Sequence, residues 1–213
     1  MELYGEFLML YQKLYAKWGI NFIMLIISYE PKILLLVHDN HWSEALRNLK
    51  EAWEKNKNDL NATLCYGCGL WYVLVYDVLV YDCEFIASDK YDKVMNNHIK
   101  ALSALTSIAF HKFKRDMDFL AIWGWMISIA PFYFFPIQTE ETYQSAEQCG
   151  TKMIQIAHHV VPNNPVYTSL YYATTDNDQM YKQARTQMGT VWQHYFAEDD
   201  FVGTYFLNIT TEK

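Results

Sequence analysis

The segment HWSEALRNLKEAW, residues 41–53, gives the clearest indication of the fold class. Apolar side chains recur in it at helical spacing, at Leu46, Leu49 and Trp53, while arginine, lysine and glutamate occupy the opposite face. Ser43 stands where it can cap a helix, and an acidic residue follows it, where the helix dipole favours a negative charge. The stretch therefore predicts an amphipathic helix that begins near Ser43.

Polar breaks and capping residues divide the rest of the chain into further helices. The expected starts are Asp59 or Asn61, Ser88 or Asp89, Asp116, Thr139 with Thr142, and Asp176. Paired with their neighbours, these helices predict hairpins over residues 43–83, 88–130 and 139–172. We therefore predict an all-α fold of stacked antiparallel helical hairpins, either a solenoid or a compact bundle. We expect one domain over residues 1–213, with possible sub-units 1–137 and 138–213.

Two fragments of the chain resemble the second helix of a tetratricopeptide repeat. That helix carries an aromatic residue, an alanine, a large apolar residue and a second alanine before a turn. In the first fragment the matching residues are Trp42, Ala45, Leu49 and Ala52; Lys57 stands where the family has its proline, and Gly67 stands at the family's glycine in the following helix. In the second fragment they are Gly150, Ile154, Ala157 and Pro162. The resemblance implies a helical repeat in which small residues let two helices approach closely.

The C-terminal half also resembles small bacterial proteins of toxin-immunity loci. The stretches that carry this resemblance are 124–128, the aromatic run 131–136, the turn 157–162, and Tyr205 with Phe206. It implies a protein partner, and it carries over no catalytic residues.

The charge of the chain disfavours nucleic acid as a partner. The net charge is −7 and the isoelectric point is near 5.4, whereas phosphate binding needs a concentrated basic face. Nine Asp and Glu against four Lys and Arg lie from Gln138 onward, so the C-terminal third is the expected surface for a basic partner. The acidic residues expected to bind it are Asp176, Asp178, Glu198, Asp199 and Asp200.

The aromatic content predicts a groove or an interface. The 7 Trp, 17 Tyr and 12 Phe exceed what a core of this size needs. Asp77 interrupts an apolar run, so it either faces a polar groove or bonds to a Tyr or Trp neighbour. Asp77, Trp71 and Tyr72 are therefore added to the expected partner-binding residues. Alternatively, Trp71, Tyr72, Tyr76, Trp123 and Trp125 line a cavity between helices.

The cysteines and histidines do not form a convincing metal site. Cys65 and Cys68 make a CxxC pair within apolar helical sequence, and no second pair completes four ligands, so we expect them to pack in the core. With Cys83 and Cys149 they make no disulfide framework, which favours a reducing cytosol. The histidine groups, His38 with His41 and His158 with His159, lack ligand spacing. We expect no cofactor.

No catalytic motif is present in the sequence. It holds no GxSxG, P-loop or GxGxxG, and its paired carboxylates, including Asp82 and Glu84, lack a neighbouring nucleophile. Residues 119–137 carry no charge over a length that could cross a bilayer. Because Pro131 and Pro136 break that segment, we expect a core helix. The N-terminus lacks the basic start of a secretory signal.

These features together favour a soluble, cytoplasmic, non-catalytic protein that binds another protein. Its expected form is a bacterial immunity protein that binds and neutralises a basic toxin domain. An enzyme or small-ligand binder with an aromatic-lined interhelical cavity is the alternative. A membrane protein is the third interpretation.

Overall fold

The computed structural model describes residues 27, 29–76, 88–191, 195–196 and 200–210. The helices in this part are α2 (Pro31–His38), α3 (Trp42–Lys55), α4 (Leu60–Tyr76), α5 (Ser88–Phe113), α6 (Met117–Ile129), the 3-10 turn η2 (Pro131–Tyr133), α7 (Glu140–Val160), α8 (Pro165–Ala173), α9 (Asp178–Gly189) and α10 (Phe201–Thr210). The described residues form no sheet, and Ile27 and Phe196 make an isolated bridge. The all-α prediction is confirmed.

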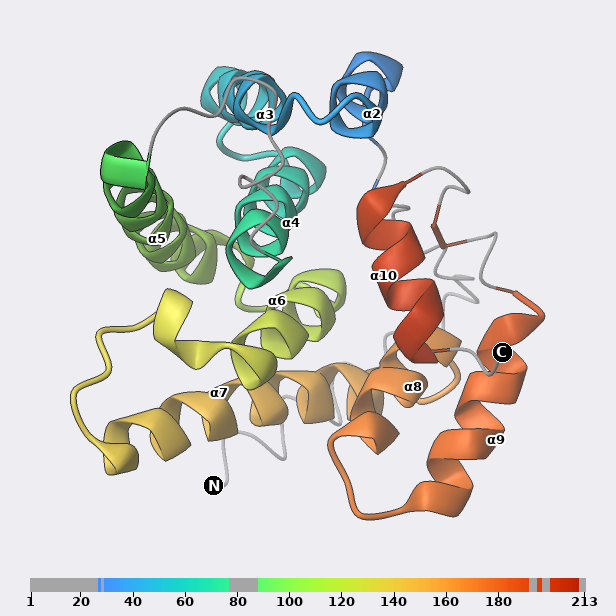
Figure 1. Ribbon diagram of the computed structural model, residues 1–213. Coiled ribbons are helices and arrows are strands. Elements are labelled where there is room, and N and C mark those ends of the chain that lie inside the picture. The colour runs from blue at the N-terminus through green and yellow to red at the C-terminus, as the bar shows by residue number, and fades with distance from the viewer. Residues whose placement is uncertain (1–26, 28, 77–87, 192–194, 197–199, 211–213) are drawn as a thin grey trace.

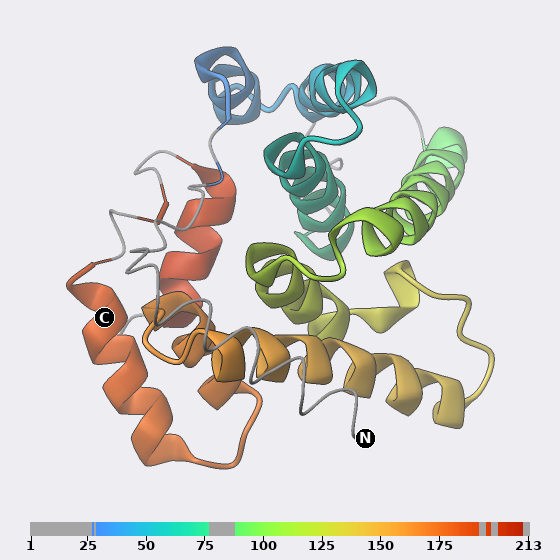
Figure 2. The same ribbon diagram turned by 180° about the vertical axis from the view of Figure 1, so that it is seen from behind.

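The helices are arranged around α4 and α6. In Figure 1, α7 runs along one side of the molecule, α6 lies on it, and α2 and α3 cover the opposite side. Helix α5 forms one flank, and α8, α9 and α10 form the other. The reverse view in Figure 2 shows the same order.

Local capping signals in the sequence position several of these helices. Asp116 caps α6, because its Oδ1 accepts hydrogen bonds from the backbone N–H of Asp118 and Phe119 at 3.0 and 3.1 Å. Thr139 and Thr142 form a reciprocal capping box at the start of α7. The predicted starts at Asp116 and Thr139 are confirmed.

Two predicted helix starts are wrong by one or two residues. Helix α3 already begins before Ser43, with His41 at the N-cap position and no side-chain cap. Helix α9 is capped by Asn177, whose side chain accepts from the backbone N–H of Met180 at 3.1 Å, and not by Asp176. In both places the N-cap lies one or two residues away from the residue that the sequence pattern indicated.

The predicted hairpin over residues 88–130 is also corrected. Helix α6 packs far more extensively on α7 than on α5, and α5 packs mainly on α4. The reason is a close crossing of two glycines: a Cβ atom on Gly150 would lie 2.5 Å from the carbonyl oxygen of Gly124. Only hydrogen at both positions lets the two helix backbones approach this closely.

Helix α6 is the apolar centre of the fold. Residues 117–127 are all buried, and the helix ends at Ile129, before Pro131. The prediction that the uncharged segment begins as a core helix is confirmed. None of the helices in the described ranges is long and apolar enough to cross a membrane.

The small residues of the tetratricopeptide resemblance divide into two kinds. Ala45 and Ala157 are fully buried, as helix crossings require. Ala52 is exposed, so it marks no crossing. The repeat resemblance itself stays a prediction.

Candidate functional site: a groove between α2, α4 and α10

A groove with a volume of about 870 Å³ opens between three helices that are far apart in the sequence. The lining residues are Pro31, Leu34, Leu35, Val37 and His38 from α2, Tyr72 and Tyr76 from α4, and Phe201, Thr204, Tyr205 and Asn208 from α10. Both ribbon views show that α10 begins beneath α2 (Figures 1 and 2).

Helix α2 forms an apolar wall of the groove. Nearly all its side chains are apolar, and because only one face of the helix can be buried, the others remain accessible. Its eight residues read PKILLLVH, and of these only Ile33 is buried. Leu35 is 65% exposed on the groove. Across the groove, Tyr76 at the end of α4 is 47% exposed. Two large apolar side chains therefore face solvent on the same groove.

The floor of the groove is a stack of aromatic rings. Trp42 lies under Tyr72 with ring centroids 5.4 Å apart and an interplanar angle of 16°. Tyr72 in turn stacks on Tyr76 at 4.6 Å, and Phe201 packs edge-on against Tyr72 at 5.1 Å. Tyr76 is the last ring of the parallel stack, and it meets the edge of Tyr205 at 6.0 Å while remaining partly exposed to solvent.

Tyr205 is the fixed element of the α10 side. Its hydroxyl oxygen accepts a hydrogen bond from Nε1 of Trp125 at 2.8 Å, and its ring packs edge-on against Trp71 at 5.0 Å. Burial raises the pKa of the Tyr205 hydroxyl well above its usual value, against the opposing effect of the Trp125 hydrogen bond. The phenol is therefore neutral.

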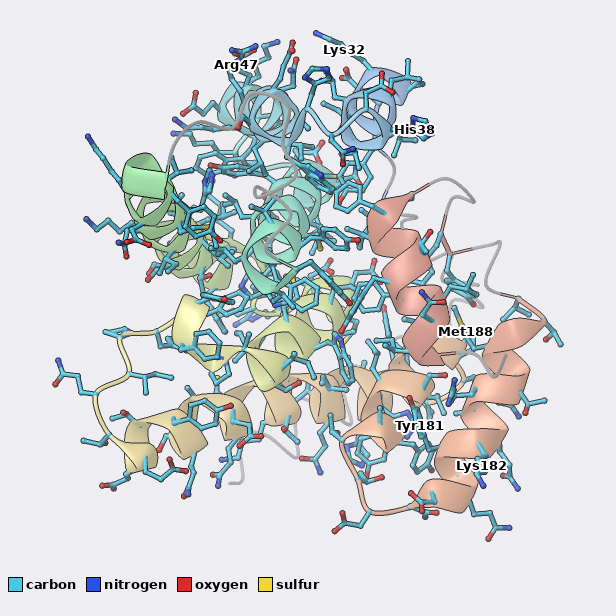
Figure 3. All side chains as sticks on the ribbon, viewed as in Figure 1. Lys32, His38, Arg47, Tyr181, Lys182 and Met188 are labelled. Atoms are coloured by element: carbon cyan, nitrogen blue, oxygen red, sulfur yellow. The ribbon has the colours of Figure 1, made fainter. Side chains whose placement is uncertain are left out.

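The groove is nearly free of charge. Among its described lining residues there is no Lys, Arg, Asp or Glu. Burial also raises the pKa of Tyr72 and Tyr76, so both phenols stay neutral. His38, labelled on α2 in Figure 3, is the one lining side chain able to carry a positive charge, and its Nδ1 lies 3.1 Å from Oδ1 of Asp39. Such a groove suits an uncharged, largely apolar group that can accept a few hydrogen bonds.

The predicted aromatic cavity is corrected by this arrangement. Tyr72 and Tyr76 line the groove as expected. Trp71, Trp123 and Trp125 do not, because they are 1%, 0% and 6% exposed within the core. Trp71 therefore has no accessible surface for a partner.

The described acidic residues that were expected to bind a partner do not share one accessible surface. Asp77, Glu198 and Asp199 lie outside the described residues. Asp176 and Asp178 are exposed at the start of α9, where the helix dipole stabilises a carboxylate. The connection from α8 to α9 lies at the far end of the molecule from α2 (Figure 1), so these acids are remote from the groove.

Asp200 is wholly buried, and its predicted role on an accessible acidic surface is wrong. Its Oδ1 accepts the backbone N–H of Val202 at 2.9 Å and so caps α10. Burial raises the pKa of the Asp200 carboxyl to about 7, although the hydrogen bonds from Val202 and Gly203 oppose the shift. The sequence places this residue in an acidic run, but in the fold it lies near Tyr29, Cys65 and Cys68, which are far from it in the chain.

The CxxC cysteines pack in the core, as predicted. Cys65 and Cys68 are buried, and burial raises the pKa of both thiols well above their usual value. They stay protonated and are poor nucleophiles or metal ligands. Cys149 is free and only partly buried, and Cys83 lies outside the described residues. The described ranges contain no group of three or more His, Cys, Asp or Glu able to hold a metal ion.

The adjacent histidines of α7 are held by ring packing. His158 stacks on Tyr171 with centroids 4.4 Å apart, and its Nδ1 lies 3.3 Å from Oγ1 of Thr168. Burial lowers the pKa of His158, and the neighbouring His159 adds to the effect. This contact joins α7 to α8.

Sequence reasoning missed the residues from α2 and α10 that complete the groove, above all Leu35, Phe201 and Tyr205. The apolar run 33–37 was a usable signal, because a helix of eight residues with almost no polar side chain cannot bury its whole surface. No local signal indicates that α10 packs beneath it.

Comparison of the chain with protein-family models, with curated proteins and with solved structures finds no significant match in any of the three.

Proposed function

We propose that this chain is a non-catalytic binding protein whose groove between α2, α4 and α10 receives an uncharged, apolar segment of a partner protein. One observation carries the proposal: Leu35 and Tyr76 expose large apolar surfaces to the same groove. Apolar surface costs free energy in water, and a contiguous exposed patch of it is typical of an interaction site. Tyrosines, which dominate the floor, are enriched at protein interfaces.

The particular form that we propose is a bacterial immunity protein that neutralises a basic toxin domain. The net charge of −7 supports this, because opposite charge accelerates encounter. The exposed Asp176 and Asp178 would contribute to long-range attraction, while the neutral groove would supply the short-range contact. The proposal includes a cytoplasmic location, since four cysteines in a chain of this size make no disulfide framework and the cytosol keeps thiols reduced.

Purification of the tagged chain after expression of its native operon tests this proposal. We expect a neighbour-encoded protein to co-purify in a stable complex and to lose its toxicity in that complex. If the chain elutes alone, or if the neighbouring product is equally toxic with and without it, the immunity function is contradicted.

A small-ligand binder is the second candidate function. A volume of about 870 Å³ lies within the range of roughly 300–1,000 Å³ typical of small-molecule pockets. Native mass spectrometry of the purified chain separates the two candidates. A bound small molecule of defined mass favours the ligand binder, whereas a bare chain that captures its neighbour-encoded protein favours the protein binder.

A further inference from the structure

Asp200 is a buried carboxyl group that lacks full hydrogen bonding. It precedes the first residue of α10, is 0% exposed, and uses Oδ1 to cap that helix. Its second oxygen, Oδ2, has no hydrogen-bond partner within the described part of the chain. In such a place the free-energy cost of removing an ionised carboxylate from water is largely uncompensated.

Among the described residues, three uncharged groups interact with Asp200. They are the hydroxyl of Tyr29, from the segment before α2, and the thiols of Cys65 and Cys68 on α4. Burial raises the pKa of each of these groups, and the nearby Asp200 raises it further. No lysine, arginine or histidine of the described residues is paired with Asp200.

Asp200 is directly connected to one wall of the groove. The next residue, Phe201, packs its ring 4.8 Å from Tyr29 and 5.1 Å from Tyr72. Thr204 and Tyr205, one turn further along α10, also line the groove. Any displacement of the first turn of α10 therefore displaces this wall.

We propose that a proton on Asp200 holds the first turn of α10 against α4, so that the groove is complete when Asp200 is neutral and loses its α10 wall when Asp200 ionises. This inference rests on the proposed function in one respect, because it makes binding in the groove depend on pH.

The direction of the effect follows from proton linkage. The carboxyl has a pKa of about 7 when buried and 3.8 when free in solution. The undocked state therefore binds fewer protons between these values, and raising the pH favours undocking. The equilibrium for undocking rises by at most about tenfold per pH unit over this range and levels off above about pH 7.

Hydrogen exchange of the α10 amides, measured between pH 5 and pH 8, tests the mechanism without any ligand. The comparison at each pH is with Asp200→Asn, which keeps the size and the cap but cannot ionise. We expect α10 protection in the wild type to fall relative to the variant by about tenfold or more and then to level off. Histidine side chains also titrate in this range, so His111→Gln, exposed on α5 and outside the groove, serves as the control and should behave as the wild type does. Equal protection in wild type and Asp200→Asn at every pH would overturn the inference.

A measurement on the unaltered chain covers the case in which Asp200→Asn does not fold. The carboxyl carbon of Asp200 should titrate near pH 7 in a carbon-13 NMR series, and titration near pH 4 would overturn the inference.

Binding of the neutral dye N-phenyl-1-naphthylamine tests the groove separately. Dye binding that weakens from pH 5 to pH 8 in the wild type and stays constant in Asp200→Asn supports both the groove as a binding site and its dependence on the Asp200 proton. Constant dye binding in both proteins overturns the inference and leaves the groove function standing. If the dye does not bind at any pH but hydrogen exchange of α10 depends on pH as predicted, the result counts against the groove and leaves the role of Asp200 intact.

Discussion

The indole nitrogen Nε1 of Trp125 donates a hydrogen bond of 2.8 Å to the hydroxyl oxygen of Tyr205, a residue 80 positions further along the chain. The bond links the buried helix α6 to α10, the helix that forms one wall of the groove. The groove is thus anchored to the centre of the core by a polar contact.

Removal of this contact should destabilise the fold. Tyr205→Phe keeps the ring and leaves the buried Trp125 N–H without a partner, which costs about 1–3 kcal/mol. Urea denaturation measures the free energy of unfolding. Tyr143→Phe is the matched control, because the Tyr143 hydroxyl makes no hydrogen bond within the described residues, and it should change stability by less than about 0.5 kcal/mol. Equal effects of the two substitutions would show that the Trp125 bond contributes nothing.

A methyl group at Gly150 should disturb the crossing of α6 and α7. The new Cβ atom would lie 2.5 Å from the carbonyl oxygen of Gly124 and 2.6 Å from the backbone nitrogen of Ser128. Both are backbone atoms, so the helices themselves must shift, and we expect Gly150→Ala to cost about 1–3 kcal/mol despite the better helix propensity of alanine. The exposed Gln148→Ala is the control and should be nearly neutral. A gain of stability in Gly150→Ala would contradict the close crossing.

The cysteines should differ strongly in reactivity. Cys65 and Cys68 are buried and their pKa values are raised, so at pH 8 they present little thiolate to an alkylating agent. Burial also raises the pKa of Cys149, but this thiol is partly exposed and should be modified by iodoacetamide before Cys65 and Cys68. Peptide mapping by mass spectrometry reads out each site, with urea-unfolded protein as the reference. Alkylation of Cys65 or Cys68 in the folded chain as fast as Cys149 would disprove their core assignment.

Local signals predicted most helix starts, although the caps expected at Ser43 and Asp176 lie at His41 and Asn177. Asp116 and Thr139 cap helices through bonds to residues two or three positions away, so the sequence alone contains both partners. The pairing of α6 with α7 was not predictable, because it depends on Gly124 and Gly150 meeting across 26 positions.

The candidate site was only partly predictable for the same reason. Tyr72 and Tyr76 were found because surplus aromatic residues are visible in composition. Asp200 was misread because its acidic neighbours in sequence suggest a solvated turn, while its burial comes from Tyr29, Cys65 and Cys68. Burial of this kind is a property of tertiary packing.

The acids at the start of α9 should act on association rate. Asp176→Asn with Asp178→Asn removes two exposed charges that lie far from the groove, so folding should be nearly unchanged. If the partner is basic, stopped-flow association should slow, and the difference should shrink as salt screens the field. Rates indifferent to both the substitutions and the salt would rule out steering by this acidic end.

The groove between α2, α4 and α10 is the surface where we propose that the partner docks. The most direct measurement is the dissociation constant of the complex with the neighbour-encoded protein, by calorimetry, for Leu35→Arg and Ile129→Arg. Leu35 is 65% exposed on the groove and Ile129 is 45% exposed on α6 outside it, so neither arginine needs to be buried in the free protein. We predict that Leu35→Arg weakens binding by at least about tenfold, because it places a charge in an apolar interface, while Ile129→Arg changes it by less than about twofold. Unaltered binding by Leu35→Arg, or equal weakening by both variants, would contradict the claim.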